Sequence, residues 1–170
     1  NDLTGLTPAA ADCEAALTRT SGAEALVVPV ACVPADGMYR LEYTSTVSGV
    51  YRLDIRYRGQ HVFGSPFEDI PIAHDSPASG ASYLAGKGAA EATAGQQTSF
   101  FIQATDQYNN NITVGGEVFK VTLEGKGQVI TGIAAYVGQG LYEATYMVEQ
   151  AGTYTLTVLL DSQFVGNQRY

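Results

Sequence analysis

The chain has 170 residues, of which 45% are hydrophobic and only 15% are charged, and its formal net charge is −8. This length allows one large domain or two small ones with a real core. Because no basic patch offsets the acidity, the composition excludes nucleic acid as a partner and argues against docking on anionic lipid. No run of about 18 apolar residues is present, so we expect no membrane insertion.

The first ten residues, "NDLTGLTPAA", form a segment that we expect to be an N-terminal arm (1–10). Leu3 and Leu6 are its larger apolar residues, and Pro8 limits any strand in it to about residues 1–7. The chain begins with Asn1 and no Met, so we expect a processed or excised product.

Cys13 and Cys32 are the only cysteines and lie 19 positions apart. Two isolated cysteines are too few for a structural zinc site. As a disulfide they would close a loop worth about 3 kcal/mol in the chain-entropy model. The sequence favours this disulfide, while two small buried thiols remain the alternative.

An internal repeat determines the expected architecture. Shifting the chain by 103 residues places Gly37 on Gly140 and gives eight identities in 31 ungapped positions. The conserved positions are turn glycines and alternating aromatic or aliphatic residues, together with one glutamine. In the first copy they are Gly37, Tyr39, Tyr43, Gly49, Tyr51, Leu53, Gln60 and Val62.

Each copy has the alternation of half-buried strands. In the first copy, residues 39–43 and 51–57 alternate in this way, and we expect them to pair as a hairpin across "TSTVSG". Further strands are expected at 98–104, 117–123 and 127–136, separated by Gly and Asn clusters. The pattern predicts an all-β chain of two tandem, antiparallel immunoglobulin-like sandwiches.

The segment 36–67 resembles the second half of a filamin-type immunoglobulin-like repeat. Its signature is the run of spaced tyrosines followed by Gly64, Ser65, Pro66 and Phe67, the turn motif of the family. The segment "GKGAAEATAGQQTSFFIQATDQYNNNITVGGEVFKVTLEG" is similar to the first half of the same repeat. The resemblance implies a seven-stranded sandwich that serves as a rod segment or a protein-binding module. Nothing resembles the separate helical domain by which actin cross-linkers of this family hold actin.

The resemblance also divides the chain into an arm (1–10), a first sandwich (11–73), a linker (74–82) and a second sandwich (83–170). The first sandwich is expected to lack its opening strands and the second to lack its final strand. Three explanations stay open at this point. The sequence is part of a longer array or has disordered ends, or the first copy is a short sandwich closed by Cys13–Cys32, or a neighbouring copy fills the gap.

The third explanation predicts an assembly mechanism. A missing edge strand leaves unpaired backbone groups beside an apolar groove. We expect this acceptor groove and sheet edge to be formed by Tyr154, Leu156, Val158, Leu160 and Val165. Leu3 and Leu6 of another copy would fill it by β-strand addition, giving a head-to-tail homopolymer that grows as an open filament.

The sequence offers little for catalysis, and we expect neither an enzyme nor a cofactor, with no catalytic and no metal-binding residues. His61 aligns with Phe164, which favours a half-buried aromatic role, and adjacent residues such as His74 and Asp75 cannot form a triad. The run "DQYNNN" (106–111) is a weak calcium candidate, and a polar turn is the alternative. Arg52, Arg56 and Arg58 are expected on a solvated face paired with Glu42 or, alternatively, as an electropositive stripe.

Asn111 begins the only N-glycosylation acceptor sequence, Asn111-Ile112-Thr113, in a loop by composition. Together with the cysteine pair it predicts an extracellular or cell-surface protein, with glycans possible at Asn111. We therefore expect an extracellular, filament-forming structural subunit. The alternative is an adhesion or spacer and ligand-binding module of a receptor ectodomain. An intracellular actin cross-linker rod is a third possibility.

Overall fold

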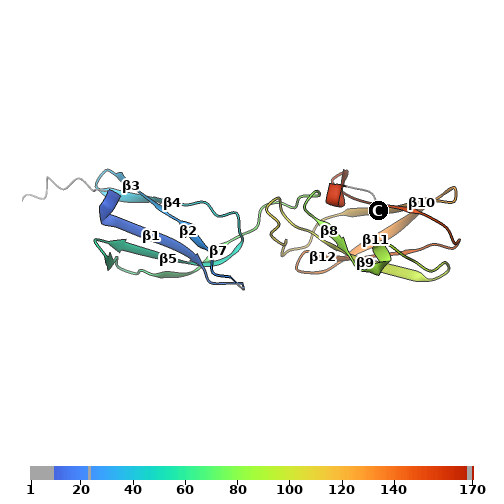
Figure 1. Cartoon of the computed structure of the whole chain (residues 1–170), viewed down its shortest axis with the longest axis horizontal. Coiled ribbons are helices and arrows are strands. Elements are labelled where there is room, and N and C mark those ends of the chain that lie inside the picture. Colours follow the sequence, from blue (N-terminus) through green and yellow to red (C-terminus); the bar gives the residue numbers. More distant parts are fainter. Residues whose placement is uncertain (1–9, 23, 168–169) are drawn as a thin grey trace, which may run out of the picture. The chain divides into compact units, whose positions relative to one another are not determined.

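In the computed structural model, which describes residues 10–22, 24–167 and 170, the chain divides into two compact units at Ala73 and His74. Both units consist of antiparallel strands, with short 3-10 turns as the only helical elements among the described residues (Figure 1). No helix in this part of the chain has the length and hydrophobicity of a membrane-spanning segment. The prediction of two tandem, antiparallel immunoglobulin-like sandwiches is confirmed.

The first unit contains one five-stranded sheet and one two-stranded sheet. In the larger sheet the order is β2-β1-β5-β6, and β7 also pairs with β5; β3 and β4 form the smaller sheet. The elements are η1 (Ala10–Asp12), β1 (Cys13–Arg19), β2 (Val27–Pro29), β3 (Ala31–Ala35), β4 (Met38–Glu42), β5 (Gly49–Tyr57), β6 (Gln60–His61) and β7 (Phe67–Ile72).

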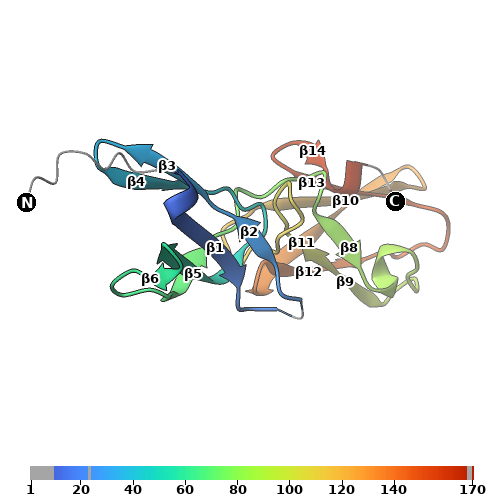
Figure 2. The same ribbon diagram turned by 60° about the vertical axis from the view of Figure 1, so that its left-hand side comes forward.

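The second unit is a more complete sandwich with the strand order β14-β13-β10-β11-β12-β9-β8. Strand β11 is long enough to serve both halves, pairing with β10 at its start and with β12 at its end (Figure 2). The elements are β8 (Tyr83–Ala85), η2 (Lys87–Ala89), β9 (Gln97–Gln103), β10 (Phe119–Gly125), β11 (Gln128–Gly138), β12 (Leu141–Met147), β13 (Thr155–Leu160), β14 (Gln163–Phe164) and η3 (Val165–Asn167).

Strand for strand, the first unit reproduces only the later part of the second. The pairing of Leu17 with Leu53 corresponds to that of Leu123 with Leu156, so β1 and β5 are the counterparts of β10 and β13. Likewise β3 and β4 correspond to the end of β11 and to β12. Among the described residues of the first unit, nothing corresponds to β8 and β9.

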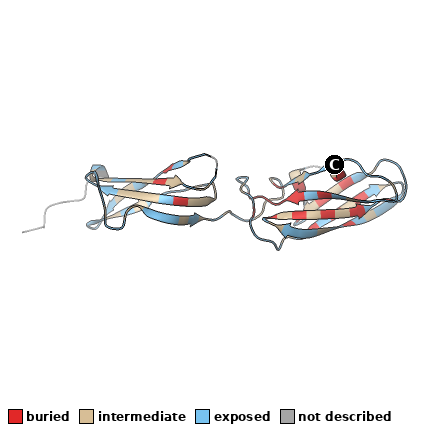
Figure 3. Ribbon diagram, turned by 90° about the horizontal axis from the view of Figure 1, so that it is seen from below, coloured by how far each residue is buried: buried red, intermediate tan, exposed pale blue. Residues whose placement is uncertain are grey.

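This difference determines how much apolar surface each unit buries. The core of the second unit contains fifteen buried apolar residues, including Phe100, Tyr142 and Leu156. The core of the first contains three, Leu17, Val28 and Tyr51, surrounded by half-buried side chains (Figure 3). Since burial of apolar surface is the main favourable contribution to folding, the first unit depends on additional constraints.

Two expectations about the chain path were wrong. Strands β4 and β5 do not form a hairpin, because they lie in different sheets and residues 44–48 connect one sheet to the other. β5 already pairs with β1 on one side and with β6 and β7 on the other, so it has no free edge for β4. In addition, the segment 74–82 is part of the second unit and not a separate linker: Ser82 is fully buried and Pro77 forms a β-bridge with Asp106.

Candidate functional site

The C-terminal residue of the second unit occupies the first position of a further strand. Tyr170 exchanges two backbone hydrogen bonds with Leu156 of β13, with N···O distances of 2.8 and 2.9 Å. The corresponding pair in the first unit is Phe67 with Leu53, where β7 begins. Tyr170 is therefore the counterpart of Phe67, as the shift of 103 residues requires.

Beyond this pair the two units differ. In the first unit β7 continues along β5 and pairs Ile70 with Tyr51 and Ile72 with Gly49. In the second unit the corresponding stretch, Gly152 to Tyr154, has no strand partner on this side among the described residues. Backbone donors and acceptors at such an edge are available to an added strand.

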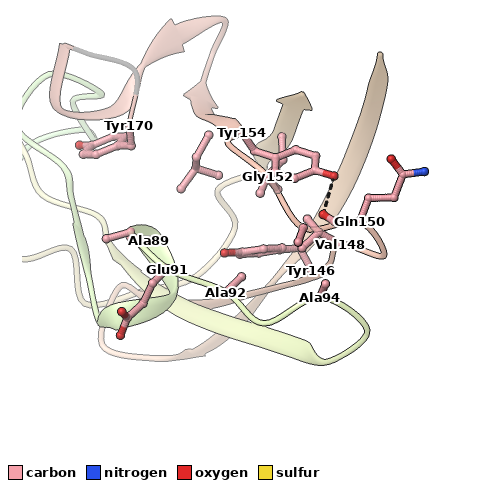
Figure 4. Close-up of a pocket in the computed structure, with 14 residues that line it drawn as sticks. Ala89, Glu91, Ala92, Ala94, Tyr146, Val148, Gln150, Gly152, Tyr154 and Tyr170 are labelled. Atoms are coloured by element: carbon pink, nitrogen blue, oxygen red, sulfur yellow. Dashed lines mark hydrogen bonds between the residues drawn. The ribbon is translucent and has the colours of Figure 1, made fainter. Parts of the chain in front are cut away.

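A pocket of about 220 Å³, lined mainly by apolar side chains but also by Glu91 and Gln150, lies beside this open edge (Figure 4). One wall is the alanine-rich segment 89–94, from the end of η2 onward. The other walls are aromatic and aliphatic residues from β10, β12 and β13 and from the turns beside them: Leu123, Tyr146, Val148, Tyr154, Leu156 and Tyr170. At its base the Tyr146 hydroxyl donates a hydrogen bond to the Gly88 carbonyl oxygen at 2.7 Å, and burial raises the pKa of Tyr146.

Tyr51 and Tyr154, which are equivalent in the two units, differ in how far they are covered. The Tyr51 hydroxyl donates to the Val47 carbonyl oxygen at 2.6 Å, and the Tyr154 hydroxyl donates to that of Gln150 at 3.0 Å. In both units the hydroxyl donates to the carbonyl oxygen four residues earlier in the chain, so the local turn is the same. Tyr51, which pairs with Ile70 of β7, is fully buried, whereas Tyr154 is only half-buried and lines the pocket.

The expected acceptor residues divide into two groups. Tyr154 and Leu156 do line the pocket. Val158, Leu160 and Val165 do not belong to it, because they are completely or almost completely buried in the core. Sequence reasoning assigned the whole apolar face of one strand to the groove, whereas the later part of that face belongs to the buried core of the second unit. It also missed the segment 89–94, whose run of alanines was the available signal.

The predicted arm residues Leu3 and Leu6 lie outside the described residues. The turn motif is described. Its Ser65–Pro66 bond is cis, and the Ser65 hydroxyl oxygen accepts a hydrogen bond from the Ile55 backbone N–H at 2.8 Å. Gly64 has a positive φ of 82°, which suits glycine. The motif thus ties the loop before β7 to β5 and positions the start of the last strand.

Cys13 and Cys32 form a disulfide. It joins β1, in the five-stranded sheet, to β3, in the two-stranded sheet. The bond therefore links the two layers of the first unit.

The carboxylate of Asp106 accepts hydrogen bonds from several neighbouring groups. Asp106 is fully buried, and its two carboxylate oxygens accept four hydrogen bonds of 2.8 to 2.9 Å, from the backbone N–H groups of Asp75, Tyr108 and Asn110 and from the Asn110 amide. Burial alone would raise the pKa of Asp106, but these hydrogen bonds outweigh it and the pKa is lowered. The geometry matches the polar-turn interpretation of 106–111. No cluster of three potential metal ligands occurs in the described part of the chain.

The arginines of β5 and the turn after it are engaged in local ion pairs. Arg52 and Arg56 both contact Asp54, and Arg58 pairs with Asp12 at 3.1 Å. Glu42, expected as their partner, instead pairs with Arg40 at 2.7 Å within β4. His61 is exposed and not half-buried as its alignment with Phe164 indicated; its Nδ1 lies 3.2 Å from the Ser65 hydroxyl.

Asn111 is exposed, directly before the fully buried Ile112. Thr113, the third residue of the acceptor sequence, interacts with His74: its N–H donates to Nε2 at 3.2 Å. The asparagine side chain is thus at the surface of a loop that is fixed to the start of the second unit.

The comparisons with known proteins agree with this architecture. The family model described as Filamin/ABP280 repeat matches residues 6–68 and 76–170. A 72-residue segment, 41% of the chain, is 38% identical to the dynein alpha chain of the flagellar outer arm of Chlamydomonas reinhardtii, of which it spans 2%.

Two solved structures match parts of the chain. The Escherichia coli adhesin FdeC matches with a TM-score of 0.53 and 19% identity, over 93% of this chain and 51% of that protein. The Lin-41 filamin domain matches with a TM-score of 0.48 and 17% identity, over 54% of this chain and 88% of that domain. The chain thus spans about half of the adhesin and a small fraction of the dynein.

Proposed function

The chain belongs to the Filamin/ABP280 repeat family, and from this premise we propose that it is a non-enzymatic structural module whose second sandwich accepts a β-strand from another copy. The observation that carries the proposal is the edge at Gly152–Tyr154, which has no strand partner among the described residues, continues the Tyr170–Leu156 pair and borders the pocket lined by Tyr154 and Leu156. Added strands at such edges gain backbone hydrogen bonds, and their alternate side chains fill pockets.

The first unit supplies the template for the strand that fits. Its β7 begins Phe67-Glu68-Asp69-Ile70, and the register shifts between the Leu53 and Tyr51 pairs, so Phe67 and Ile70, their partners, are three positions apart. Asp69 has a positive φ of 56° in this irregularity. Such a conformation is uncommon for residues with a side chain and is most easily adopted by glycine.

The N-terminal arm carries the same spacing in sequence. Leu3-Thr4-Gly5-Leu6 aligns with Phe67-Glu68-Asp69-Ile70, and a glycine stands where the template needs positive φ. In this alignment Leu3 replaces Tyr170 beside Leu156, and Leu6 enters the position beside Tyr154. Since the donor segment and the acceptor edge are different parts of the same chain, successive copies would join head to tail into an open filament.

Matched charge variants of the arm test the proposal. The wild-type chain is expected to form filaments visible by negative-stain electron microscopy. Leu6→Asp should abolish them, because it places a charge in the apolar pocket, while Thr4→Asp should leave them intact, because Thr4 aligns with the exposed Glu68. Filaments that persist in Leu6→Asp would contradict the role of the arm, and a monomeric wild type would contradict the assembly itself.

A mixing experiment tests the head-to-tail order. Ala92→Glu blocks the pocket but leaves the arm intact, whereas Leu6→Asp does the reverse. Both variants also carry Leu41→Lys, which blocks the edge of β4, so each alone should sediment as a monomer. An equimolar mixture should form dimers and nothing longer, because only one productive joint exists per pair. Longer species in the mixture would show that copies join elsewhere.

The alternative function is that of a spacer or ligand-binding module in a cell-surface protein. The similarity in fold to the adhesin FdeC is compatible with this role. It predicts monodisperse wild-type monomers in the sedimentation experiment, whereas the preferred function predicts polymers. An actin cross-linker rod is less well supported, since disulfides are rare in cytosolic proteins.

We also propose an extracellular or cell-surface location, supported by the Cys13–Cys32 disulfide and the exposed Asn111. Secretion from eukaryotic cells should then add one N-glycan at Asn111, seen as a mass increase that peptide N-glycosidase removes. Asn111→Gln should lack the increase. Free thiols and an unmodified Asn111 in the secreted protein would contradict this location.

A further inference from the structure

The first unit has an open edge of its own, at β4. In the second unit the corresponding strand, β12, lies between β11 and β9. In the first unit β4 has only β3 as a strand neighbour among the described residues. The face of β4 that carries Leu41 borders a pocket of about 190 Å³, together with Cys13, Ile55, Tyr57 and Val62. The residues that correspond to these in the second unit are buried: Phe119, Ala144, Val158, Leu160 and Val165.

The hairpin turn fixes which backbone groups reach the edge. Asp36 and Gly37 both have positive φ, 46° and 80°, so β3 and β4 are joined by a two-residue turn closed by the pair Ala35–Met38. In an antiparallel ladder, bonding alternates from one side of a strand to the other. Met38, Arg40 and Glu42 therefore bond toward β3, and the N–H and C=O groups of Leu41 point to the open edge.

The side chains on this strand are complementary to a second copy of the same strand. Arg40 and Glu42 lie on the exposed face, while Tyr39 and Leu41 lie on the half-buried face; Tyr43, directly after the strand end, follows the same alternation but is itself exposed. Placing Leu41 opposite Leu41 of an antiparallel copy puts Arg40 opposite Glu42 twice. The same register puts Tyr39 opposite Tyr43. Opposite charges and apolar pairs directly across strands both stabilise a sheet.

We propose that two copies of the chain pair through β4 about a two-fold axis at Leu41, forming the four-stranded sheet β3-β4-β4-β3. The alternative register, with Arg40 opposite Arg40, places like charges directly across from one another and is disfavoured. The interface is isologous, so it closes on itself at two copies. It is separate from the head-to-tail joint of the proposed function and does not depend on it.

Reciprocal charge reversals test both the interface and its register. The measurements use the full-length chain carrying Leu6→Asp, so that arm donation does not contribute, and sedimentation equilibrium as the readout. Arg40→Glu alone and Glu42→Arg alone each turn two attractive pairs into two repulsive pairs. Each should raise the dimer dissociation constant by about tenfold or more. An equimolar mixture of the two variants should form mixed dimers, and the double variant Arg40→Glu/Glu42→Arg should dimerise alone.

The outcomes decide between pairing and its absence. Dimers in the parent chain, lost in the single variants and restored in both combinations, support the proposal. A parent chain that is monomeric at about millimolar concentration, or single variants that dimerise as well as the parent, would overturn it. Since Arg40 and Glu42 are exposed, neither change disturbs the fold, and an unchanged near-ultraviolet circular dichroism spectrum verifies this. Leu41→Lys should also abolish dimers, because it places a charge at the centre of the edge.

Discussion

Replacing both Cys13 and Cys32 by serine is expected to unfold the first unit and to leave the second unit folded. The disulfide closes a loop of 19 residues, which corresponds to about 3 kcal/mol in the chain-entropy model. The described part of the first unit has only three buried apolar residues and no counterparts of β8 and β9, so little other stabilisation is available. Because marginal domains have only about 5 kcal/mol of stability in total, this loss is large.

Hydrogen exchange followed by mass spectrometry measures this effect unit by unit. In the serine variant, amides of β5 should exchange far faster than in wild type, while those of β13 keep their protection. Wild-type protein treated with a reductant provides the matched control and should behave like the variant. If β5 amides stay protected in both samples, the half-buried side chains of the first unit suffice to hold it together and the disulfide is dispensable.

Replacing Asp106 by alanine is expected to destabilise the second unit by about 3 kcal/mol. The carboxylate accepts four hydrogen bonds, and its removal leaves the partly buried donors of Asp75, Tyr108 and Asn110 without their acceptor. Asp75 lies at the start of the unit and Asp106 in a loop after β9, so the change also detaches the segment 74–82. Denaturant titration of the second unit's unfolding transition measures the loss.

The same carboxylate gives the second unit a pH dependence. The pKa of Asp106 is lowered in the folded state below its ordinary value of 3.8, so its contribution is fully present above that value. As the pH falls below it and through the folded pKa, protonation removes the contribution. The unfolding midpoint of wild type should therefore fall in this acidic range, and that of Asp106→Ala should fall less. Equal decreases in both proteins would assign the acid sensitivity to other groups.

The repeat and its register could be predicted because they rest on strong local signals. Turn glycines and tyrosines at a fixed shift identified β12 and β13 as copies of β4 and β5, and the pairing of Tyr170 with Leu156 follows that shift. The family resemblance to filamin repeats came from the same residues. These signals depend on backbone conformation and on alternation along one strand, both of which are local.

The predictions that failed are those that depend on which strands pair or pack together in the folded chain. The alternation around Tyr39 and Tyr51 is the same whether β4 and β5 pair or lie in opposite sheets, so a hairpin could not be distinguished from a connection between layers. For the same reason Val158 and Leu160 could not be separated from Tyr154: one face of β13 is part core and part pocket wall. The burial of Ser82 and the anchoring of Asp75 to Asp106 depend on contacts far along the chain, which a Pro- and Ser-rich composition hides.

The position of Tyr170 has a kinetic consequence. It pairs with Leu156 through two backbone hydrogen bonds, while Gly152–Tyr154 have no strand partner among the described residues. In the proposed assembly, an incoming strand would bind at Gly152–Tyr154 first, as a toehold, and then displace Tyr170 from Leu156. Exchange would then proceed without complete exposure of the groove. The exchange rate would depend on how many contacts the incoming strand makes at Gly152–Tyr154. Changing those contacts would alter the rate of strand exchange more than the final binding affinity.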